Sequence, residues 1–377
     1  MSAADTRGNL AVRPRPRMPE GAAGRLCDRI LVHTGVTSLQ LAAQWVDPDI
    51  SGLWVGGRRL PDRIARWLAG YPGVMVLDPE AYTTSFASPD AVFALPAGQL
   101  FATLDDVLDE QLRAGATVAV TPTRYLGAGD SRSLRALVSQ ARTIERDDTI
   151  LVVPFAVDWL GPVRFGEFRD TLASVSLPIA LMFGGQHDPL ERFASAVRRV
   201  RLLERELPHV MRARTDLAAF DGLAHGSFAG AVGFGGSRRH LVPPGSPHDA
   251  SRRTPSVLVP HLMRYVHSDE LAERLHRGVP RCSCAACEDR SLGGFLHEAD
   301  RDDADAHNLC IWTQWLRELH DHDTLVDRAF WWRAKCRAAL DEHERLDTVH
   351  GYRVFPPRRA LRRYAEEAPW PAASSSP

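Results

Sequence analysis

The feature that most constrains the fold is a regular alternation of short apolar runs with segments of helical periodicity. Seven runs rich in valine, isoleucine and leucine have the length of a buried strand: residues 52–55, 74–77, 117–120, 150–153, 179–183, 210–213 and 229–234. An eighth strand is available at residues 30–32 or 257–259. Between the runs, apolar residues recur at helical spacing, as at Leu134, Leu137, Val138 and Ala141. Helices that connect successive strands make those strands parallel, so the pattern predicts an α/β fold, the closed (β/α)8 or TIM barrel.

The barrel is expected to occupy residues 25–275, followed by a helical module over residues 276–368. Residues 1–24 contain the run Arg13-Pro-Arg-Pro-Arg17 among small residues, which predicts a flexible segment. Residues 369–377, rich in alanine, serine and proline, predict a disordered tail.

Composition excludes some environments and partners. No apolar run reaches the length of a membrane span, and the N-terminus lacks the layout of a signal peptide, so we expect a cytoplasmic protein without a membrane partner. The formal net charge of the 377 residues is only -1. A nucleic-acid partner would therefore have to be bound by local clusters of arginine rather than by a global basic field.

Three of the six cysteines fall within six residues, at Cys282, Cys284 and Cys287, and His307 follows twenty residues after the last of them. Three thiolates and one imidazole form the closed tetrahedral shell of a structural zinc site, so the spacing predicts bound Zn²⁺. Such a shell leaves no position for water or substrate, and the metal would stabilise the C-terminal module without taking part in chemistry.

The identity of the fourth ligand stays open on ligand chemistry alone. His297 and Cys310 lie near His307 in the sequence, and either side chain could replace it in the shell.

The residues around the cysteines resemble the zinc module of the tRNA-guanine transglycosylase family. In that family a Cys-x-Cys-x2-Cys motif is followed by a Leu-His pair and later by His-Asn-Leu at the start of a helix, and residues 295–297 and 307–309 match these landmarks. The acidic connection over residues 298–306 is shorter than the family's. The resemblance implies a diverged member of this superfamily, which includes relatives that insert 7-deazaguanine bases into DNA, with Cys282, Cys284, Cys287 and His307 as ligands.

In a barrel of this kind the chemistry lies where the strands end, on the C-terminal face. Residues 74–82 look like the family's strand that ends in a general acid/base aspartate, which makes Asp78 the first catalytic candidate. This chain has Pro79-Glu80 where the family has Ser-Gly, and proline stiffens a backbone that glycine leaves free to approach a base.

The family's nucleophilic aspartate has no counterpart here. The corresponding residues 230–236 and the following Ser-Arg-Arg-His contain no acid. Base exchange by double displacement needs one carboxylate to form a glycosyl-enzyme and a second group to handle the proton. Asp216, at the preceding strand end, is the nearest substitute and the second catalytic candidate, with Asp158 and Asp188 behind it.

Further polar and glycine residues at these strand ends are candidates for binding substrate. They are Asp158, Gly185, Gln186, Asp188, Gly235 and Arg239. An acid in such a position also serves commonly as a helix cap, and Asp216 stands directly before the helical pattern of residues 217–220.

Arginine clusters and tryptophans agree with a nucleic-acid substrate, although exposed helix faces for the arginines and a packed core for the tryptophans are the plainer explanation. The arginine clusters lie at residues 198–201, 238–239, 252–253 and 358–363, and the tryptophans are Trp312, Trp315, Trp331 and Trp332.

Two hypotheses follow. The first is an enzyme that exchanges a guanine-type base in tRNA or DNA for a 7-deazaguanine-type base, acting alone, as a homodimer or with an accessory subunit. The second is a non-catalytic nucleic-acid-binding or partner subunit of the same superfamily that has lost the nucleophile. An unrelated barrel hydrolase with a zinc-binding appendage is a third, more remote possibility.

Overall fold

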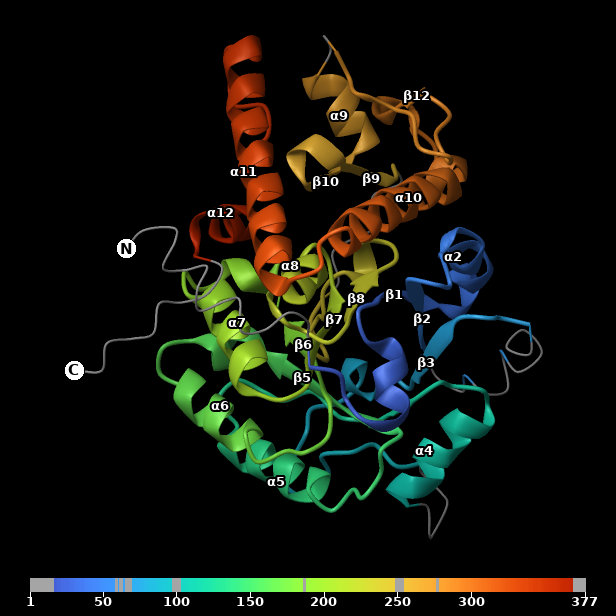
Figure 1. The fold of residues 1–377 in the computed structure, drawn as a ribbon, viewed down its shortest axis with the longest axis vertical. Coiled ribbons are helices and arrows are strands. Elements are labelled where there is room, and N and C mark those ends of the chain that lie inside the picture. Colours follow the sequence, from blue (N-terminus) through green and yellow to red (C-terminus); the bar gives the residue numbers. More distant parts are fainter. Residues whose placement is uncertain are drawn as a thin grey trace.

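The structure, a computed structural model, describes residues 17–57, 60, 64, 70–96, 103–185, 188–247, 254–275 and 278–368. Its centre is a sheet of eight parallel strands in the order β3-β2-β1-β8-β7-β6-β5-β4 (Figure 1). The strands are β1 Ile30–Gly35, β2 Ser51–Gly56, β3 Val74–Asp78, β4 Ala119–Val120, β5 Thr149–Ala156, β6 Ile179–Gly184, β7 Val210–Thr215 and β8 Gly230–Gly233. A parallel bridge between Val76 and Val118 joins β3 to the residues before β4. The predicted (β/α)8 barrel is confirmed.

All seven predicted strands belong to this sheet, and the eighth is the run at residues 30–32. The alternative run at residues 257–259 lies outside the barrel, in β9 Ser256–Val259, which pairs antiparallel with β10 Arg264–His267.

Helices surround the barrel as the periodicity predicts. They are α2 Leu39–Trp45, α4 Leu104–Arg113, α5 Ser131–Ala141, α6 Phe165–Leu172, α7 Ala196–Glu206 and α8 Ala218–His225. Helix α5 buries Leu134, Leu137, Val138 and Ala141, the residues whose spacing marked it in the sequence. It begins at Asp130, whose side chain accepts a hydrogen bond from the Ser133 N–H.

The C-terminal module lies at one end of the barrel (Figure 1). Its elements are α9 Ser268–Arg274, the short hairpin β11 Arg281–Cys282 and β12 Arg290–Ser291, and the helices α10 Arg301–His320, α11 Leu325–His350 and α12 Arg359–Glu366. Helix α10 packs against β9 and α2, while α11 packs against α8 and α12. Two elements before the boundary predicted at residue 275 contact this module: β9 packs against α10, and α9 packs against the 3-10 helix η8 Leu292–Gly294.

Three of the four tryptophans considered as nucleic-acid contacts are core residues. Trp312, Trp315 and Trp332 are buried, and Trp331 is partly buried against the same core. The indole ring of Trp332 stacks on Phe220 of α8, with the ring centroids 5.8 Å apart. These tryptophans therefore attach the C-terminal module to the barrel.

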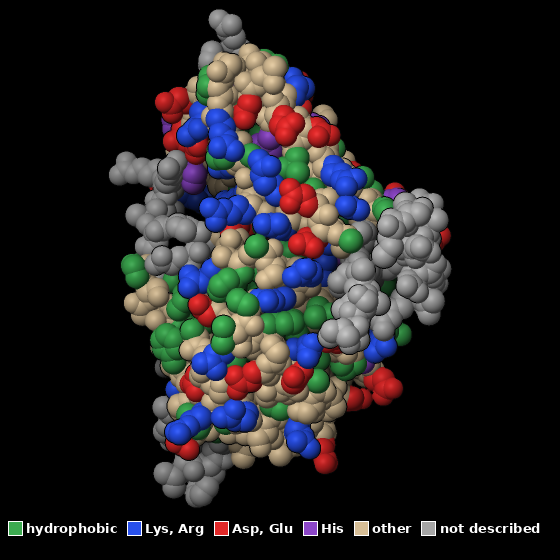
Figure 2. Space-filling model, turned by 90° about the vertical axis from the view of Figure 1, so that its left-hand side faces the viewer, with side chains coloured by type: hydrophobic (Ala, Val, Ile, Leu, Met, Phe, Trp, Pro, Cys, Tyr) green, Lys and Arg blue, Asp and Glu red, His purple; other side chains and the backbone are tan. Residues whose placement is uncertain are grey.

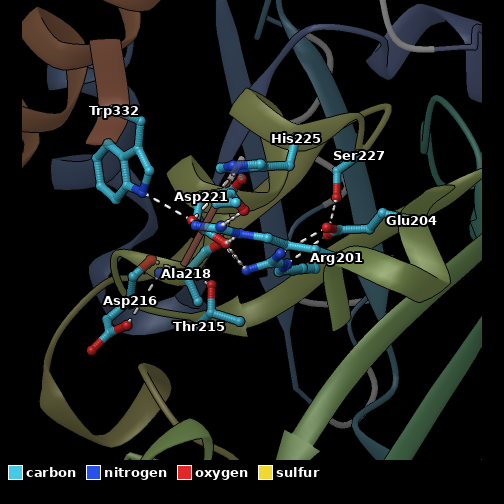
Figure 3. Close-up of polar contacts among 11 residues, drawn as sticks. Arg201, Glu204, Thr215, Asp216, Ala218, Asp221, His225, Ser227 and Trp332 are labelled. Atoms are coloured by element: carbon cyan, nitrogen blue, oxygen red, sulfur yellow. Dashed lines mark hydrogen bonds and ion pairs between the residues drawn. The ribbon is translucent and has the colours of Figure 1, made fainter. Parts of the chain in front are cut away.

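A buried network of charged side chains strengthens this attachment (Figure 3). Arg212 of β7 donates to Glu204 Oε2 of α7 at 2.7 Å and to Asp221 Oδ2 of α8 at 3.0 Å. Asp221 also accepts from Arg201 at 2.6 Å and from the Trp332 indole N–H at 3.0 Å. Two arginines thus face two carboxylates away from solvent, and α11 contributes one of the hydrogen bonds.

Burial and the neighbouring charged groups shift the pKa values of the side chains in this network. Burial raises the pKa of Asp221, but the positive charges of Arg201 and Arg212 outweigh it, and the pKa falls below the usual range. Burial lowers the pKa of His225 to about 3, so this imidazole is neutral at physiological pH.

Part of the segment predicted to be flexible, residues 1–24, has regular secondary structure. Residues 21–24 were expected to be flexible, but they belong to the 3-10 helix η1 Gly21–Leu26, which buries Ala23 and Leu26. The Ala22 N–H also donates to the Asp147 carbonyl oxygen at 3.1 Å. Residues 1–16 and the predicted disordered tail, residues 369–377, lie outside the described part of the chain. No helix within the described part has the length and apolar character needed to cross a membrane.

Candidate active site and metal centre

The three cysteines and the histidine of the predicted zinc motif come together in the fold. The ligand atoms of Cys282, Cys284, Cys287 and His307 all lie within 4.8 Å of one another. His307 Nδ1 is 3.2 Å from Cys287 Sγ and 3.7 Å from Cys284 Sγ. The hairpin of β11 and β12 supplies the cysteines and α10 supplies the histidine, so a metal ion bound here would join two separate elements. The group can hold a metal ion with a closed shell of three sulfurs and one nitrogen.

A neighbouring strand orients the histidine. His307 Nε2 lies 2.8 Å from the Leu258 carbonyl oxygen of β9, which places the proton on Nε2 and leaves the Nδ1 lone pair facing the cysteines. Asn308, the next residue, accepts from the Leu258 N–H at 2.6 Å and donates to the Ser256 carbonyl oxygen at 3.0 Å. The His-Asn pair therefore attaches the metal site to β9.

The two alternative fourth ligands do not replace His307. His297 is exposed at the N-terminus of the 3-10 helix η9 Glu298–Asp300, where its backbone N–H donates to Asp300. Cys310 lies within hydrogen-bonding reach of Cys284, but it is not a member of the four-residue group found among the described residues.

At the C-terminal ends of the strands, here called the barrel mouth, Asp78 is held by three donors. Its Oδ2 accepts from the Tyr82 hydroxyl at 2.6 Å and from the Trp54 indole N–H at 2.9 Å, and its Oδ1 accepts from the Glu80 N–H at 2.8 Å. The residue is only 2% exposed. The carboxylate is thus covered in this conformation, and Tyr82 would have to move before a substrate could reach it.

A cluster of ion pairs spans the barrel mouth. Glu80, after β3, accepts from Arg214 of β7 at 2.7 Å and also pairs with Arg238. His33 of β1 lies with Nε2 3.5 Å from the Glu80 carboxylate and is fully buried. Burial raises the pKa of Glu80, but His33, Arg214 and Arg238 together outweigh it, and the pKa falls below the usual range.

The backbone at both ends of this ion pair is strained. Glu80 and Arg214 each have a φ of 52°, in the left-handed region that glycine tolerates best. The register of β7 against β8 shifts between Arg212 and Thr215, and this bulge turns the side chain of Arg214 into the mouth. Strain that the surrounding structure maintains in this way occurs preferentially at functional sites.

Two glycines make room for the cluster. A Cβ atom on Gly56 would lie 2.7 Å from Nη1 of Arg238, and one on Gly35 would lie 2.8 Å from Nη2 of the same guanidinium. Glycine at the ends of β1 and β2 therefore permits an arginine to lie directly over the strands.

Two further carboxylates share a small cavity beside this cluster. The cavity is lined by Asp188 after β6, Asp216 after β7 and His240 after β8, with Arg214 at its edge. Asp216 Oδ2 is 3.8 Å from His240 Nε2, and its side chain is 13% exposed. Burial and the charge of Asp216 raise the pKa of Asp188 well above the usual range, which favours the protonated form of Asp188 beside Asp216. Asp216 points away from the buried Asp221 network (Figure 3).

The other predicted site residues are dispersed. Asp158 pairs with Arg192 at 3.0 Å at the edge of the mouth, and the Gly185 N–H donates to the Leu241 carbonyl oxygen. Gly235 adopts a φ of 77° beside open space. Arg239 is buried, with its guanidinium 3.4 Å from the centroid of the Tyr265 ring, away from the mouth. Gln186 lies outside the described residues.

His33, Glu80 and Arg214 were not selected from the sequence, and Arg238 was named there only within the arginine cluster at residues 238–239. Together these four residues form the centre of the mouth. Glu80 was noticed only as a departure from Ser-Gly. A signal was present, since His33 and Arg214 both lie at the C-terminal end of a predicted barrel strand, where functional side chains collect.

No protein-family model and no curated protein matches this sequence. The likeness to the tRNA-guanine transglycosylases thus depends on the motifs alone and stays a prediction.

Replacing His307 tests the ligand set. We expect purified wild-type protein to carry one metal ion per chain and His307→Ala to lose it, because a shell with three ligands binds more weakly and the unfolded chain has no preformed site. Elemental mass spectrometry measures the ratio. His297→Ala and Cys310→Ser are the matched controls and should retain the metal; metal retained in His307→Ala and lost in Cys310→Ser would overturn the assignment.

The raised pKa of Asp188 predicts a pH-dependent cost in stability. Below the unfolded pKa both states hold the proton; as pH rises, the unfolded state releases it first and the folded state loses stability, by at most about 1.4 kcal/mol per pH unit. We therefore expect Asp188→Asn to match the wild type near pH 4 and to exceed its free energy of unfolding at pH 7, as measured by urea titration. Exposed Asp170→Asn should show no such change, and a less stable Asp188→Asn at pH 7 would contradict the prediction.

Proposed function

We propose that the protein is a transglycosylase-like enzyme that exchanges a guanine-type base in tRNA or DNA for a 7-deazaguanine-type base. The observation that most supports this is that Asp188, whose pKa is raised by burial and by Asp216, lines one cavity together with Asp216. Base exchange needs a nucleophile and a proton donor next to each other, and two acids in unlike environments can divide these roles.

In the proposed reaction Asp216 attacks the anomeric carbon of the target nucleotide. The glycosidic bond breaks, its electron pair leaves with the base, and Asp188 donates its proton to that base. The incoming base then attacks the same carbon, which frees the Asp216 carboxylate, and the proton of the incoming base returns to Asp188. Asp78 would orient Tyr82 and Trp54 at the mouth, because its oxygens are already occupied.

The cavity between the two carboxylates has a volume of about 10 Å³, which is room for one water. A purine is far larger, so the proposal requires the mouth to open when substrate binds. The side chain of His240 is 21% exposed and lines the cavity, which makes it the group most easily displaced.

We further propose that the metal is zinc. Three thiolates and one imidazole are the ligand set that zinc takes in closed structural sites. The group can then be expected to hold the β11–β12 hairpin against α10 and, through His307, against β9, with no part in the base exchange.

One observation favours the second hypothesis, a non-catalytic nucleic-acid-binding or partner subunit. The Glu80 carboxylate is neutralised by Arg214 and Arg238 across the mouth, and β8 is followed by arginine where the family has its nucleophile. Two cations in this position would bind an anionic group without needing to cleave anything.

A base-incorporation assay separates the two. Protein is incubated with a radiolabelled guanine or 7-deazaguanine base and either tRNA or duplex DNA, and label in the polymer is counted. We expect incorporation by the wild type, its loss in Asp216→Asn, which lacks the nucleophile, and a reduction of about 10²- to 10⁴-fold in Asp188→Asn, which cannot donate the proton.

Asp170→Asn, an exposed substitution on α6, is the control and should incorporate at the wild-type rate. No label in either polymer from protein that still binds nucleic acid would reject the enzyme and favour the non-catalytic subunit. Full activity in Asp216→Asn would show that another group is the nucleophile.

A further inference from the structure

The arginines of the sequence clusters lie in different environments in the fold. Arg201 is buried against Asp221, Arg238 pairs with Glu80, and Arg239 is buried against Tyr265. Residues 252–253 lie outside the described part of the chain. The arginines of α12 instead reach solvent: Arg359 and Arg362 are both exposed.

These arginines line a groove between α12 and the loop after β6. Its volume is about 340 Å³, and its charged lining consists of Arg192, Arg359, Arg362 and Arg363 with Glu191 and Glu366. The groove, called here the arginine groove, therefore carries a net charge of +2. On the face that carries α7 and α12, arginine and lysine side chains are numerous and are interspersed with acidic ones (Figure 2).

The cations of the groove are only partly neutralised. Arg192 pairs with Asp158, and Arg363 lies 3.7 Å from Glu366. For the guanidinium groups of Arg359 and Arg362 the described residues provide neither a hydrogen bond nor an ion pair. Each presents a planar fork of donors to solvent, the geometry that binds two oxygens of one phosphate.

Helix α12 holds these arginines in a defined place. Its opposite face buries Ala360, Leu361, Tyr364 and Ala365. At its start the Arg359 N–H donates to Glu191 Oε1 at 2.8 Å, and near its end the Ala365 carbonyl oxygen accepts from Arg333 of α11 at 2.9 Å. The helix is thus attached both to the loop after β6 and to the C-terminal module.

The groove also adjoins the candidate active site. Leu190, in the 3-10 helix η5 Pro189–Glu191, lines both the groove and the cavity of Asp188 and Asp216. A chain of phosphates lying on the groove would therefore pass next to the two carboxylates.

We propose that the arginine groove binds the phosphodiester backbone of the nucleic-acid substrate and so positions the target nucleotide at the barrel mouth. This inference rests on the proposed function. Contact through guanidinium groups to phosphate is independent of base sequence and weakens as salt rises, because each contact releases condensed counterions.

The test compares two double variants of equal charge. Arg359→Gln/Arg362→Gln removes two cations from the groove, while Arg132→Gln/Arg142→Gln removes two exposed arginines at the two ends of α5. Glutamine is a good helix former and all four sites are exposed, so both variants should fold. Binding of a fluorescent DNA duplex and of an RNA hairpin is measured by anisotropy over a range of salt concentrations, with polyglutamate as competitor.

We expect the groove variant to bind every nucleic-acid sequence more weakly than the wild type does. The plot of log affinity against log salt concentration should become less steep by about 2 in the groove variant, while the α5 variant keeps the wild-type slope. Polyglutamate should compete poorly. Equal slopes in the two variants, no binding by the wild type, or competition by polyglutamate as strong as by nucleic acid would each overturn the proposal.

The base-incorporation assay keeps this result distinct from the proposed function. Weakened binding in the groove variant together with no incorporation by the wild type would establish the docking surface and reject the enzyme. Incorporation by the wild type together with unchanged binding in the groove variant would support the enzyme and reject the arginine groove as the docking surface.

Discussion

The interaction on which the rest of the fold depends is the buried pairing of Arg212 with Glu204 and Asp221. It joins β7 to the helices on either side of it, and through the indole of Trp332 it joins the barrel to the C-terminal module. Removing one partner of such a network leaves a buried charge uncompensated, which costs several kcal/mol. Because Arg212 is held on the helix side of β7, the bulge that follows it can turn Arg214 into the mouth.

The C-terminal module and the barrel have different roles in the structure. The tryptophans attach the C-terminal module to the barrel, and a group that can hold a metal ion, Cys282, Cys284, Cys287 and His307, lies within the module. The module in turn places α12 beside the loop after β6. The barrel mouth carries opposite charges in close contact, with Glu80 paired to two arginines on one side and Asp188 and Asp216 lining one cavity on the other. A strained backbone at Glu80 and Arg214 and a buried acid with a raised pKa are features that occur preferentially at functional sites.

Much of the fold could be predicted because it depends on local patterns. Strand-helix alternation predicted the barrel, and the spacing of Cys282, Cys284, Cys287 and His307 predicted that these four residues come together. The mouth could not be predicted in the same way. Glu80 and Arg214 are 134 residues apart, and their contact depends on barrel closure and on a bulge, neither of which leaves a local signal.

The central claim is that a carboxylate at the end of β7 takes the role of the aspartate missing after β8. Its most direct test is peptide mapping by mass spectrometry of protein that is denatured during base exchange, when the glycosyl-enzyme should be populated. The account predicts a nucleic-acid adduct joined as an ester to Asp216. An adduct on another residue, or base exchange that proceeds with no adduct, would contradict it.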